Sequence, residues 1–180
     1  MPSQSRAAQV DLSTTPYYHC VSRCVRRAFL CGEDPYTGQS YEHRKGWIVD
    51  KLRSLSTSFA VDVCAYAVMS NHFHVVLRVD AERAASWSDE EVLGRYGKLF
   101  KGAKAQLEAL SEEARGERLA LFRARLSDLS WMMRVLNESV ARRANKEDGC
   151  TGRFWEGRFK SQPLLDEAGL VTCMGYVDLN

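Results

Sequence analysis

Two apolar runs in the first half of the chain constrain its fold more than any other feature. Residues 61–69 (VDVCAYAVM) and 73–79 (FHVVLRV) are rich in β-branched and aromatic side chains, and only a few polar residues separate them. Runs of this length and composition are typical of strands, and so short an interruption leaves room only for a tight turn. The pair therefore predicts an antiparallel hairpin at the centre of a sheet.

One strand and one helix are predicted before the hairpin. Residues 17–25 (YYHCVSRCV) are aromatic and β-branched, which indicates a strand, and a turn-prone stretch around Pro35 and Gly38 follows it. From 42 to 59, apolar side chains recur three and four residues apart among Arg and Lys. This spacing predicts an amphipathic helix with one buried face.

The sequence after the hairpin predicts a helical insertion, then a strand and a last helix. Residues 82–147 are charged and rich in Ala and Leu. Pro163 follows a glycine-rich loop and marks a short strand, and Asp166 is a suitable N-cap for a helix through Leu179. The helices expected within the insertion cover 89–101, 103–125 and 128–146.

Taken in order, these elements predict an α+β fold in a single domain, residues 1–180. A strand, a helix, a hairpin, an inserted helical lobe at about 82–147, a strand and a helix suit a ferredoxin-like antiparallel sheet with helices on one face. With 45% hydrophobic residues, the chain is long enough for one substantial core.

Composition restricts the function only weakly. The 25 Lys and Arg against 23 Asp and Glu leave a net charge of +2, which does not by itself indicate a nucleic-acid-binding protein. The N-terminal residues lack the features of a signal peptide, and no apolar run approaches membrane-spanning length. We therefore expect a soluble, cytoplasmic protein that binds no membrane, and six scattered cysteines that are free and mostly buried.

His72 and His74 form a His-x-His unit where the second strand of the hairpin begins. Because strand side chains alternate, both rings leave the same face, with Cα atoms about 6.6 Å apart. Two imidazoles in that arrangement suit one divalent ion. The alternative, in which one ring caps the turn and the other is partly buried, is equally compatible with the pair alone.

Tyr176 and Asn180 lie one helical turn apart on the predicted last helix, so they share a face. A tyrosine hydroxyl is a poor nucleophile at neutral pH, and a nearby cation both favours loss of its proton and offsets charge on a phosphate. Asn180 could add an oxygen ligand to the histidine pair. Position alone also allows Tyr176 to be an ordinary half-buried aromatic residue.

Three segments in this order resemble the single-tyrosine (HUH) transposases: AYAVMSNHFHVVLRV, GRFWEGRFKSQPLL and GYVDLN. The resemblance is greatest to the REP-associated tyrosine transposase branch of the insertion-sequence-200-like family, and it extends from about Tyr17 to Asn180. It implies that His72 and His74 bind Mg²⁺ or Mn²⁺, that Asn180 is the third ligand, and that Tyr176 is the nucleophile.

The resemblance also implies a reaction and a substrate. In that family the tyrosine attacks a phosphodiester of single-stranded hairpin DNA during DNA transposition, leaving a 5′-phosphotyrosine link and a free 3′-OH. Reversal by another 3′-OH rejoins the strands, and the covalent link makes ATP unnecessary. Relatives continue past the position of Asn180, which implies that part of the DNA-binding surface is absent here. Such proteins act as monomers or dimers, so a homodimer stays open.

Basic and aromatic side chains are candidates for DNA contacts. The stretch GRFWEGRFK offers cations for phosphates and rings for unpaired bases, although the same rings could equally close the core. The first strand and the insertion add further arginines. The predicted DNA-binding residues are Arg23, Arg142, Arg143, Arg153, Trp155, Arg158 and Lys160.

Two other functions remain open on the sequence. A non-catalytic, domesticated hairpin-binding protein would keep the fold and its groove, but it has no chemical need for a His pair facing a tyrosine. A phosphodiesterase acting on small nucleotides needs two separated histidine motifs, whereas His19 and His43 stand alone.

Overall fold

A four-stranded antiparallel sheet forms the centre of the molecule, whose computed structural model describes residues 10–25 and 28–178. The strands are ordered β2-β3-β1-β4, and every pair of neighbours is antiparallel. This order is that of the ferredoxin-like arrangement, so the predicted fold class is confirmed. The strands are β1 (Tyr17–Arg23), β2 (Val61–Val68), β3 (His72–Val79) and β4 (Lys160–Pro163).

The β2–β3 hairpin is the predicted one. The Met69 N–H donates a hydrogen bond to the His72 carbonyl at 2.8 Å, which closes the turn over Ser70 and Asn71. Alternate side chains of β3 enter the main core, namely Phe73, Val75, Leu77 and Val79. The intervening positions, which include His72 and His74, therefore face the other side of the sheet.

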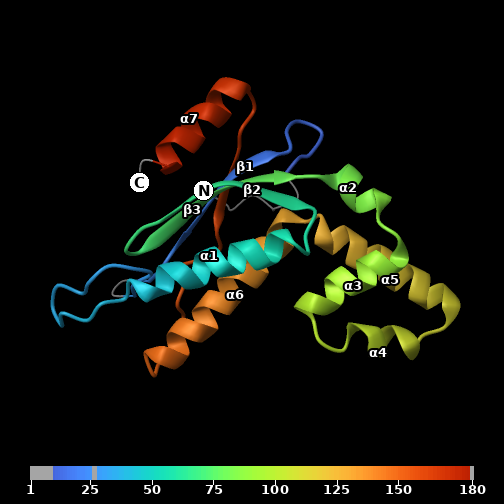
Figure 1. Cartoon of the computed structure of the whole chain (residues 1–180), viewed down its shortest axis with the longest axis horizontal. Helices are drawn as coiled ribbons and strands as arrows, with labels where there is room; N and C mark the ends of the chain where they lie inside the picture. Colours follow the sequence, from blue (N-terminus) through green and yellow to red (C-terminus); the bar gives the residue numbers. More distant parts are fainter. Residues whose placement is uncertain (1–9, 26–27, 179–180) are drawn as a thin grey trace.

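Two long helices cover the core face of the sheet (Figure 1). They are α1 (His43–Ser56) and α6 (Leu129–Glu147), and both lie close to the predicted ranges. Their inward side chains are large and apolar, with Ile48 and Leu55 on α1 and Leu136 on α6 all fully buried. No helix in the described ranges is both long and apolar enough to cross a membrane.

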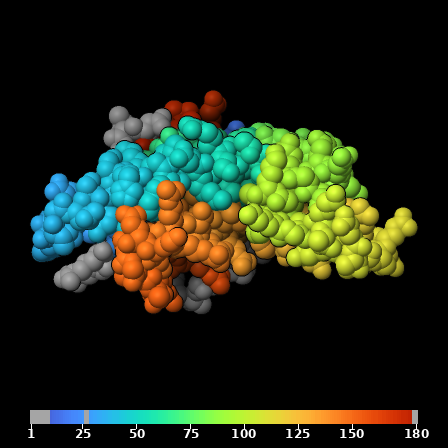
Figure 2. Space-filling model, turned by 60° about the horizontal axis from the view of Figure 1, so that its bottom comes forward, coloured from blue at the N-terminus to red at the C-terminus, as the bar shows by residue number. Residues whose placement is uncertain are grey.

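A lobe of four helices projects beside this body (Figures 1 and 2). It has its own apolar cluster, in which the rings of Tyr96 and Phe122 stack with centroids 3.8 Å apart. The helix expected over 103–125 is two helices, because the Ser111 side chain accepts a hydrogen bond from the Ala114 N–H and starts a new one. The helices are α2 (Ala81–Ser86), α3 (Asp89–Leu99), α4 (Ala103–Glu108) and α5 (Glu112–Leu126).

The boundary of the lobe differs from the predicted insertion at about 82–147. Helix α6 contributes Met132, Leu136 and Val140 to the same core as α1, so it belongs to the body. The inserted lobe therefore narrows to α2–α5. A helical periodicity cannot separate the two cases, because both kinds of helix bury one apolar face.

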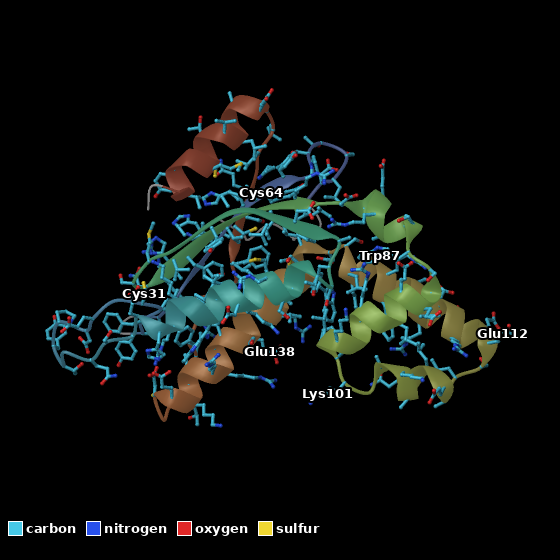
Figure 3. All side chains as sticks on the ribbon, viewed as in Figure 1. Cys31, Cys64, Trp87, Lys101, Glu112 and Glu138 are labelled. Atoms are coloured by element: carbon cyan, nitrogen blue, oxygen red, sulfur yellow. The ribbon has the colours of Figure 1, made fainter. Side chains whose placement is uncertain are left out.

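The last helix, α7 (Glu167–Asp178), lies on the opposite face of the sheet from α1 and α6 (Figure 1). The prediction of helices on one face therefore holds for α1 and α6 only. Asp166 accepts a hydrogen bond from the Gly169 N–H at 2.6 Å, as expected of its N-cap position. Val177 packs against the small residues Ala65 and Ala67, and Figure 3 shows Cys64 on this side of the sheet.

Candidate functional site

Strand β3 presents both predicted metal ligands on the face that α7 partly covers. Val21 and Arg23 of β1 lie directly opposite His74 and His72 in the antiparallel register. The two imidazole centroids are 5.0 Å apart, with their planes at 68°. The alternation along the strand thus brings the rings together, as the His-x-His spacing predicts.

Each ring of the pair keeps one nitrogen available. The Nδ1 atom of His72 lies 2.7 Å from the Asn71 side-chain oxygen, which leaves Nε2 as its second nitrogen. The Nε2 atom of His74 is buried and has no hydrogen-bond partner among the described residues. A buried nitrogen without a partner costs free energy unless something binds it. That nitrogen is a suitable ligand for a metal ion, so the histidine pair fits the ion that the resemblance implies.

A third histidine joins the pair. His19, on β1, has its Nε2 atom 2.8 Å from the Nδ1 atom of His74, and the two rings are nearly parallel with centroids 5.0 Å apart. Sequence reasoning left His19 as an isolated residue. The even spacing of residues along the strand could have revealed it. His19 and Arg23 are four residues apart on β1, so they share a face.

Burial lowers the pKa of all three imidazoles. For His74, burial acts together with the nearby His19, His72 and Arg23 and lowers the pKa to about 4. Burial and then Arg23 lower the pKa of His72, and burial lowers that of His19. Each ring is therefore neutral at neutral pH, which is the form whose lone pair binds a metal ion.

Tyr176 lies beside the histidines on α7. Its ring meets the His74 ring edge-on, with centroids 5.7 Å apart and planes at 81°. The next residue, Val177, is only 1% exposed and anchors the helix to the sheet, whereas Tyr176 itself is 52% exposed. The docking of α7 thus holds a solvent-accessible phenol next to the candidate metal ligands.

The proposed third ligand, Asn180, lies outside the described residues. Within those residues, no three His, Cys, Asp or Glu side chains are grouped so as to hold a metal ion. An ion bound by His72 and His74 would therefore complete its coordination with other oxygen atoms, such as those of an amide, water or a phosphate.

Three of the predicted DNA-binding residues gather in one groove next to the histidines. Arg23, Arg158 and Lys160 line it together with Val21 and Glu156, and the three basic side chains are exposed. Lys160 pairs with Val21 across β4 and β1, so it shares the face of His74. This surface, called the site groove below, offers cations to a phosphate backbone close to Tyr176.

The other predicted DNA-binding residues lie elsewhere. On α6, Arg142 forms an ion pair with Glu138, and the Arg143 guanidinium lies 4.0 Å from the centre of the Trp47 ring. Both belong to the helical layer on the far face of the sheet. Arg153 is exposed in the loop after α6. The structure therefore does not bring these three arginines to the histidines.

Trp155 contributes mainly to packing. Its Nε1 atom donates a hydrogen bond to the Asn137 carbonyl at 2.8 Å, and its ring meets the Phe73 ring edge-on. The neighbouring Phe154 and Phe159 are buried in the core. The alternative noted for these aromatic residues, that they close the core, is thus what the structure shows for Phe154 and Phe159, whereas Trp155 keeps part of its ring accessible.

No protein-family model and no curated protein matches the sequence. Among solved structures, the chain is similar to a REP-associated tyrosine transposase bound to a REP hairpin. The TM-score is 0.53, the sequence identity is 12%, and the match covers 99% of this chain and 72% of the other. This chain has the fold of a REP-associated tyrosine transposase. The resemblance drawn from the three motifs is thereby confirmed at the level of the fold.

Proposed function

We propose that this chain is a metal-dependent single-tyrosine DNA transposase, which cleaves and rejoins single-stranded hairpin DNA. The observation that carries the proposal is the edge-on contact of Tyr176 with His74, beside a second neutral imidazole. A fold shared with a transposase bound to a DNA hairpin supports the choice of substrate. A structural role for the same residues would leave the orphaned His74 nitrogen unexplained.

In the proposed reaction, Tyr176 is the nucleophile. Its phenolic oxygen attacks the phosphorus of one phosphodiester, so an O–P bond to the tyrosine forms and the P–O3′ bond breaks. The proton lost by the phenol is balanced by the proton that the departing 3′ oxygen gains. The products are a 5′-phosphotyrosine link and a free 3′-OH, and attack by another 3′-OH reverses the step and joins strands.

The remaining residues bind and orient the DNA. His72 and His74 would hold Mg²⁺ or Mn²⁺ through their Nε2 atoms, with Asn180 proposed as a further ligand. When bound, the ion supplies positive charge that polarises the phosphate and favours the deprotonated phenol. The cations of the site groove bind neighbouring phosphates and hold the strand against the sheet. Valine and alanine contacts fix α7, and therefore Tyr176, over the histidines.

The proposal is tested by separating binding from cleavage. A hairpin oligonucleotide with single-stranded flanks is mixed with the wild type or with His72→Ala, in Mn²⁺ or in excess chelator. We expect His72→Ala to bind the hairpin with nearly unchanged affinity, because binding depends on the groove, but to lose cleavage by more than about 100-fold. Binding is measured by fluorescence anisotropy and cleavage on a sequencing gel.

The control variant Arg53→Ala alters an exposed arginine of α1 that pairs with Asp50, and it should cleave normally. Hairpin binding by the wild type without any metal-dependent cleavage would overturn the enzyme and favour a non-catalytic hairpin-binding protein. Cleavage by His72→Ala at the wild-type rate would remove that residue from the metal site.

A further inference from the structure

His19 contacts the candidate site without being one of its proposed metal ligands. It belongs to β1, and its ring lies against His74 with one nitrogen–nitrogen distance of 2.8 Å. That distance is a hydrogen bond, so one of the two nitrogens carries the shared hydrogen and the other accepts it. The position of this hydrogen decides whether the Nε2 atom of neutral His74 carries a hydrogen or a lone pair.

Two tautomeric arrangements satisfy the contact. If His19 donates, then neutral His74 carries its own hydrogen on Nε2, where a buried N–H has no acceptor among the described residues. If His74 donates from Nδ1, its Nε2 atom is a bare lone pair. An unsatisfied buried donor costs free energy, whereas a lone pair can bind a metal ion.

We propose that His19 is a positioning residue that accepts a hydrogen bond from Nδ1 of His74 and so holds Nε2 ready for the metal ion. This inference rests on the proposed function. The ring planes are only 13° apart, so this hydrogen bond also fixes the orientation of His74. A metal-bound histidine commonly has such a partner on its second nitrogen.

The test uses two substitutions, of which one keeps the hydrogen-bond acceptor of His19 and the other keeps its ring. His19→Gln keeps an acceptor oxygen but loses the ring, whereas His19→Phe keeps a ring for packing but has no acceptor. We expect His19→Phe to weaken Mn²⁺ binding about 10- to 100-fold and His19→Gln to weaken it by less than about threefold. Mn²⁺ affinity is measured by titration calorimetry, and thermal unfolding of both variants checks that they fold.

The tautomer itself is read from the metal-free protein. Nitrogen-15 NMR of the imidazoles should show hydrogen on Nδ1 of His74 in the wild type and in His19→Gln, and a mixture of tautomers in His19→Phe. Hydrogen on Nε2 of His74 in the wild type, or equal Mn²⁺ affinity for His19→Phe and the wild type, would overturn the role of His19. A wild type that binds no Mn²⁺ would overturn the proposed function, and the NMR result would still decide which tautomer His19 holds.

The helical lobe borders a second surface, which lies outside the proposed site. Three hollows join end to end on the surface. The site groove shares Gly157 and Arg158 with a second hollow beside α6, and that one shares Trp131 and Arg134 with a third between α6 and the lobe. Figure 2 shows α6 and the lobe side by side. The second and third hollows together are called the lobe groove below.

The lobe groove is cationic. Arg134 and Arg158 are exposed, and no ion pair with either is found among the described residues. The acids that line it are already engaged, since Asp128 caps α6 through the Ser130 and Trp131 N–H groups and Glu138 pairs with Arg142. The other basic residues that line it are Lys101, Arg118 and Arg125.

Aromatic surface accompanies the charge. The guanidinium carbons of Arg125 and Arg134 lie 4.2 and 5.0 Å from the centre of the Trp131 ring. Stacking holds these two side chains in place, and Arg125 also donates a hydrogen bond to the Tyr96 hydroxyl at 2.8 Å. The exposed Arg134 guanidinium can still donate N–H groups to phosphates. Figure 3 shows Lys101 on the lobe and Glu138 on α6, the two walls between which the third hollow lies.

The site groove and the second hollow meet at Gly157 and Arg158, just before the edge strand β4, and extend toward different faces of the sheet. The site groove lies on the α7 face, whereas Asn137, which lines the second hollow, donates a hydrogen bond to Ser22 on the core face. Duplex DNA is stiff over about 150 base pairs and bends from one face of the sheet to the other only at a large cost. A single strand bends freely, and it is bound by cations interleaved with aromatic rings.

We infer that the lobe groove binds single-stranded DNA that flanks the sequence held in the site groove. The inference deepens the proposed function, on which it rests. Affinity is measured by anisotropy for a blunt hairpin, for the same hairpin with a 15-nucleotide single-stranded flank, and for the flank made double-stranded. We expect the single-stranded flank to raise the affinity of the wild type for the hairpin. Arg134→Glu should reduce this gain in affinity about 10-fold.

Arg53→Glu provides the control, because Arg53 is likewise an exposed arginine and lies on α1, outside the groove. Both variants should bind the blunt hairpin as the wild type does. Equal gains from single- and double-stranded flanks, or an equal loss by Arg134→Glu on blunt and flanked hairpins, would overturn the lobe groove. Failure of the wild type to bind any hairpin would instead count against the proposed function, and a free single-stranded oligonucleotide still tests the groove.

Discussion

The two faces of the sheet are built for different tasks. On the core face, α1 and α6 bury large apolar side chains against Phe73, Val75 and Leu77, and the buried Arg44 and Ser22 are polar exceptions. On the opposite face, α7 covers only a small cluster around Ala67 and Val177, and the histidines and Tyr176 lie beside it. The first face supplies most of the apolar burial that stabilises the fold. The second face buries less apolar surface and carries the cluster of His19, His72 and His74 beside Tyr176.

Burying polar groups on the α7 face lowers the stability of the fold, and the apolar burial on the core face offsets this loss. His74 is 7% exposed, yet one of its ring nitrogens has no partner in the part of the chain that the structure describes. An unsatisfied buried nitrogen costs on the order of 1–3 kcal/mol. Such a group persists where the rest of the fold is stable enough, and it marks a place where an ion or substrate is expected to bind.

The largest effect that the comparison predicts comes from the core face. Leu136 of α6 is fully buried, so Leu136→Ala leaves a cavity that the surrounding side chains fill only partly. We expect the free energy of unfolding to fall by about 2–5 kcal/mol. Urea denaturation measures it. A loss below about 1 kcal/mol would mean that the core face is not the main source of stability.

A smaller effect is expected under α7. Val177→Ala removes two buried methyl groups and should lower the free energy of unfolding by about 1–2 kcal/mol. Because Val177 anchors the helix that carries Tyr176, cleavage should fall more than hairpin binding does. The matched control is Val171→Ala on the exposed side of the same helix, which should change stability by less than about 0.5 kcal/mol. Equal effects of the two variants would mean that α7 is not docked as described.

The smallest predicted difference is in the rates at which thiols on the two faces react in the native state. None of the six cysteines forms a disulfide, as the sequence predicts. Cys24 on the core side is buried, and burial raises its pKa to about 12, whereas Cys173 under α7 is partly exposed. With an alkylating reagent at pH 8, Cys150 should react first, Cys173 later, and Cys24 only on unfolding. Mass spectrometry of digests gives the order, and equal rates for Cys24 and Cys173 would mean that both faces are equally sealed.

Local patterns predicted the elements well because each depends on neighbours in the sequence. The hairpin expected from 61–69 and 73–79 is found at Val61–Val68 and His72–Val79. Alternation along one strand was also enough to place the two metal-ligand candidates on one face. Local patterns do not predict which face of the sheet a distant segment covers. The position of α7 on the face opposite α1 and α6 is an example.

Contacts between distant residues carry no local signal. His19 and His74 are 55 residues apart and meet only because β1 pairs with β3. Arg44 lies in a helix whose charged residues were expected to be solvated, yet its side chain is fully buried. It donates to the Phe29 carbonyl and forms an ion pair with Asp148 at the end of α6. Periodicity assigns an arginine to the wet face unless the partner that neutralises it is known.

The central claim, that Tyr176 becomes linked to DNA, is tested most directly by trapping the covalent product. The protein is incubated in Mn²⁺ with a hairpin oligonucleotide labelled at its 3′ end, which a 5′-phosphotyrosine link retains, or at its 5′ end, which it releases. The wild type and the control Tyr36→Phe, a tyrosine 87% exposed and distant in sequence, should give a 3′-labelled adduct on a denaturing gel, and Tyr176→Phe should give none. A wild-type adduct that persists undiminished in Tyr176→Phe, or that carries the 5′ label, would contradict the account.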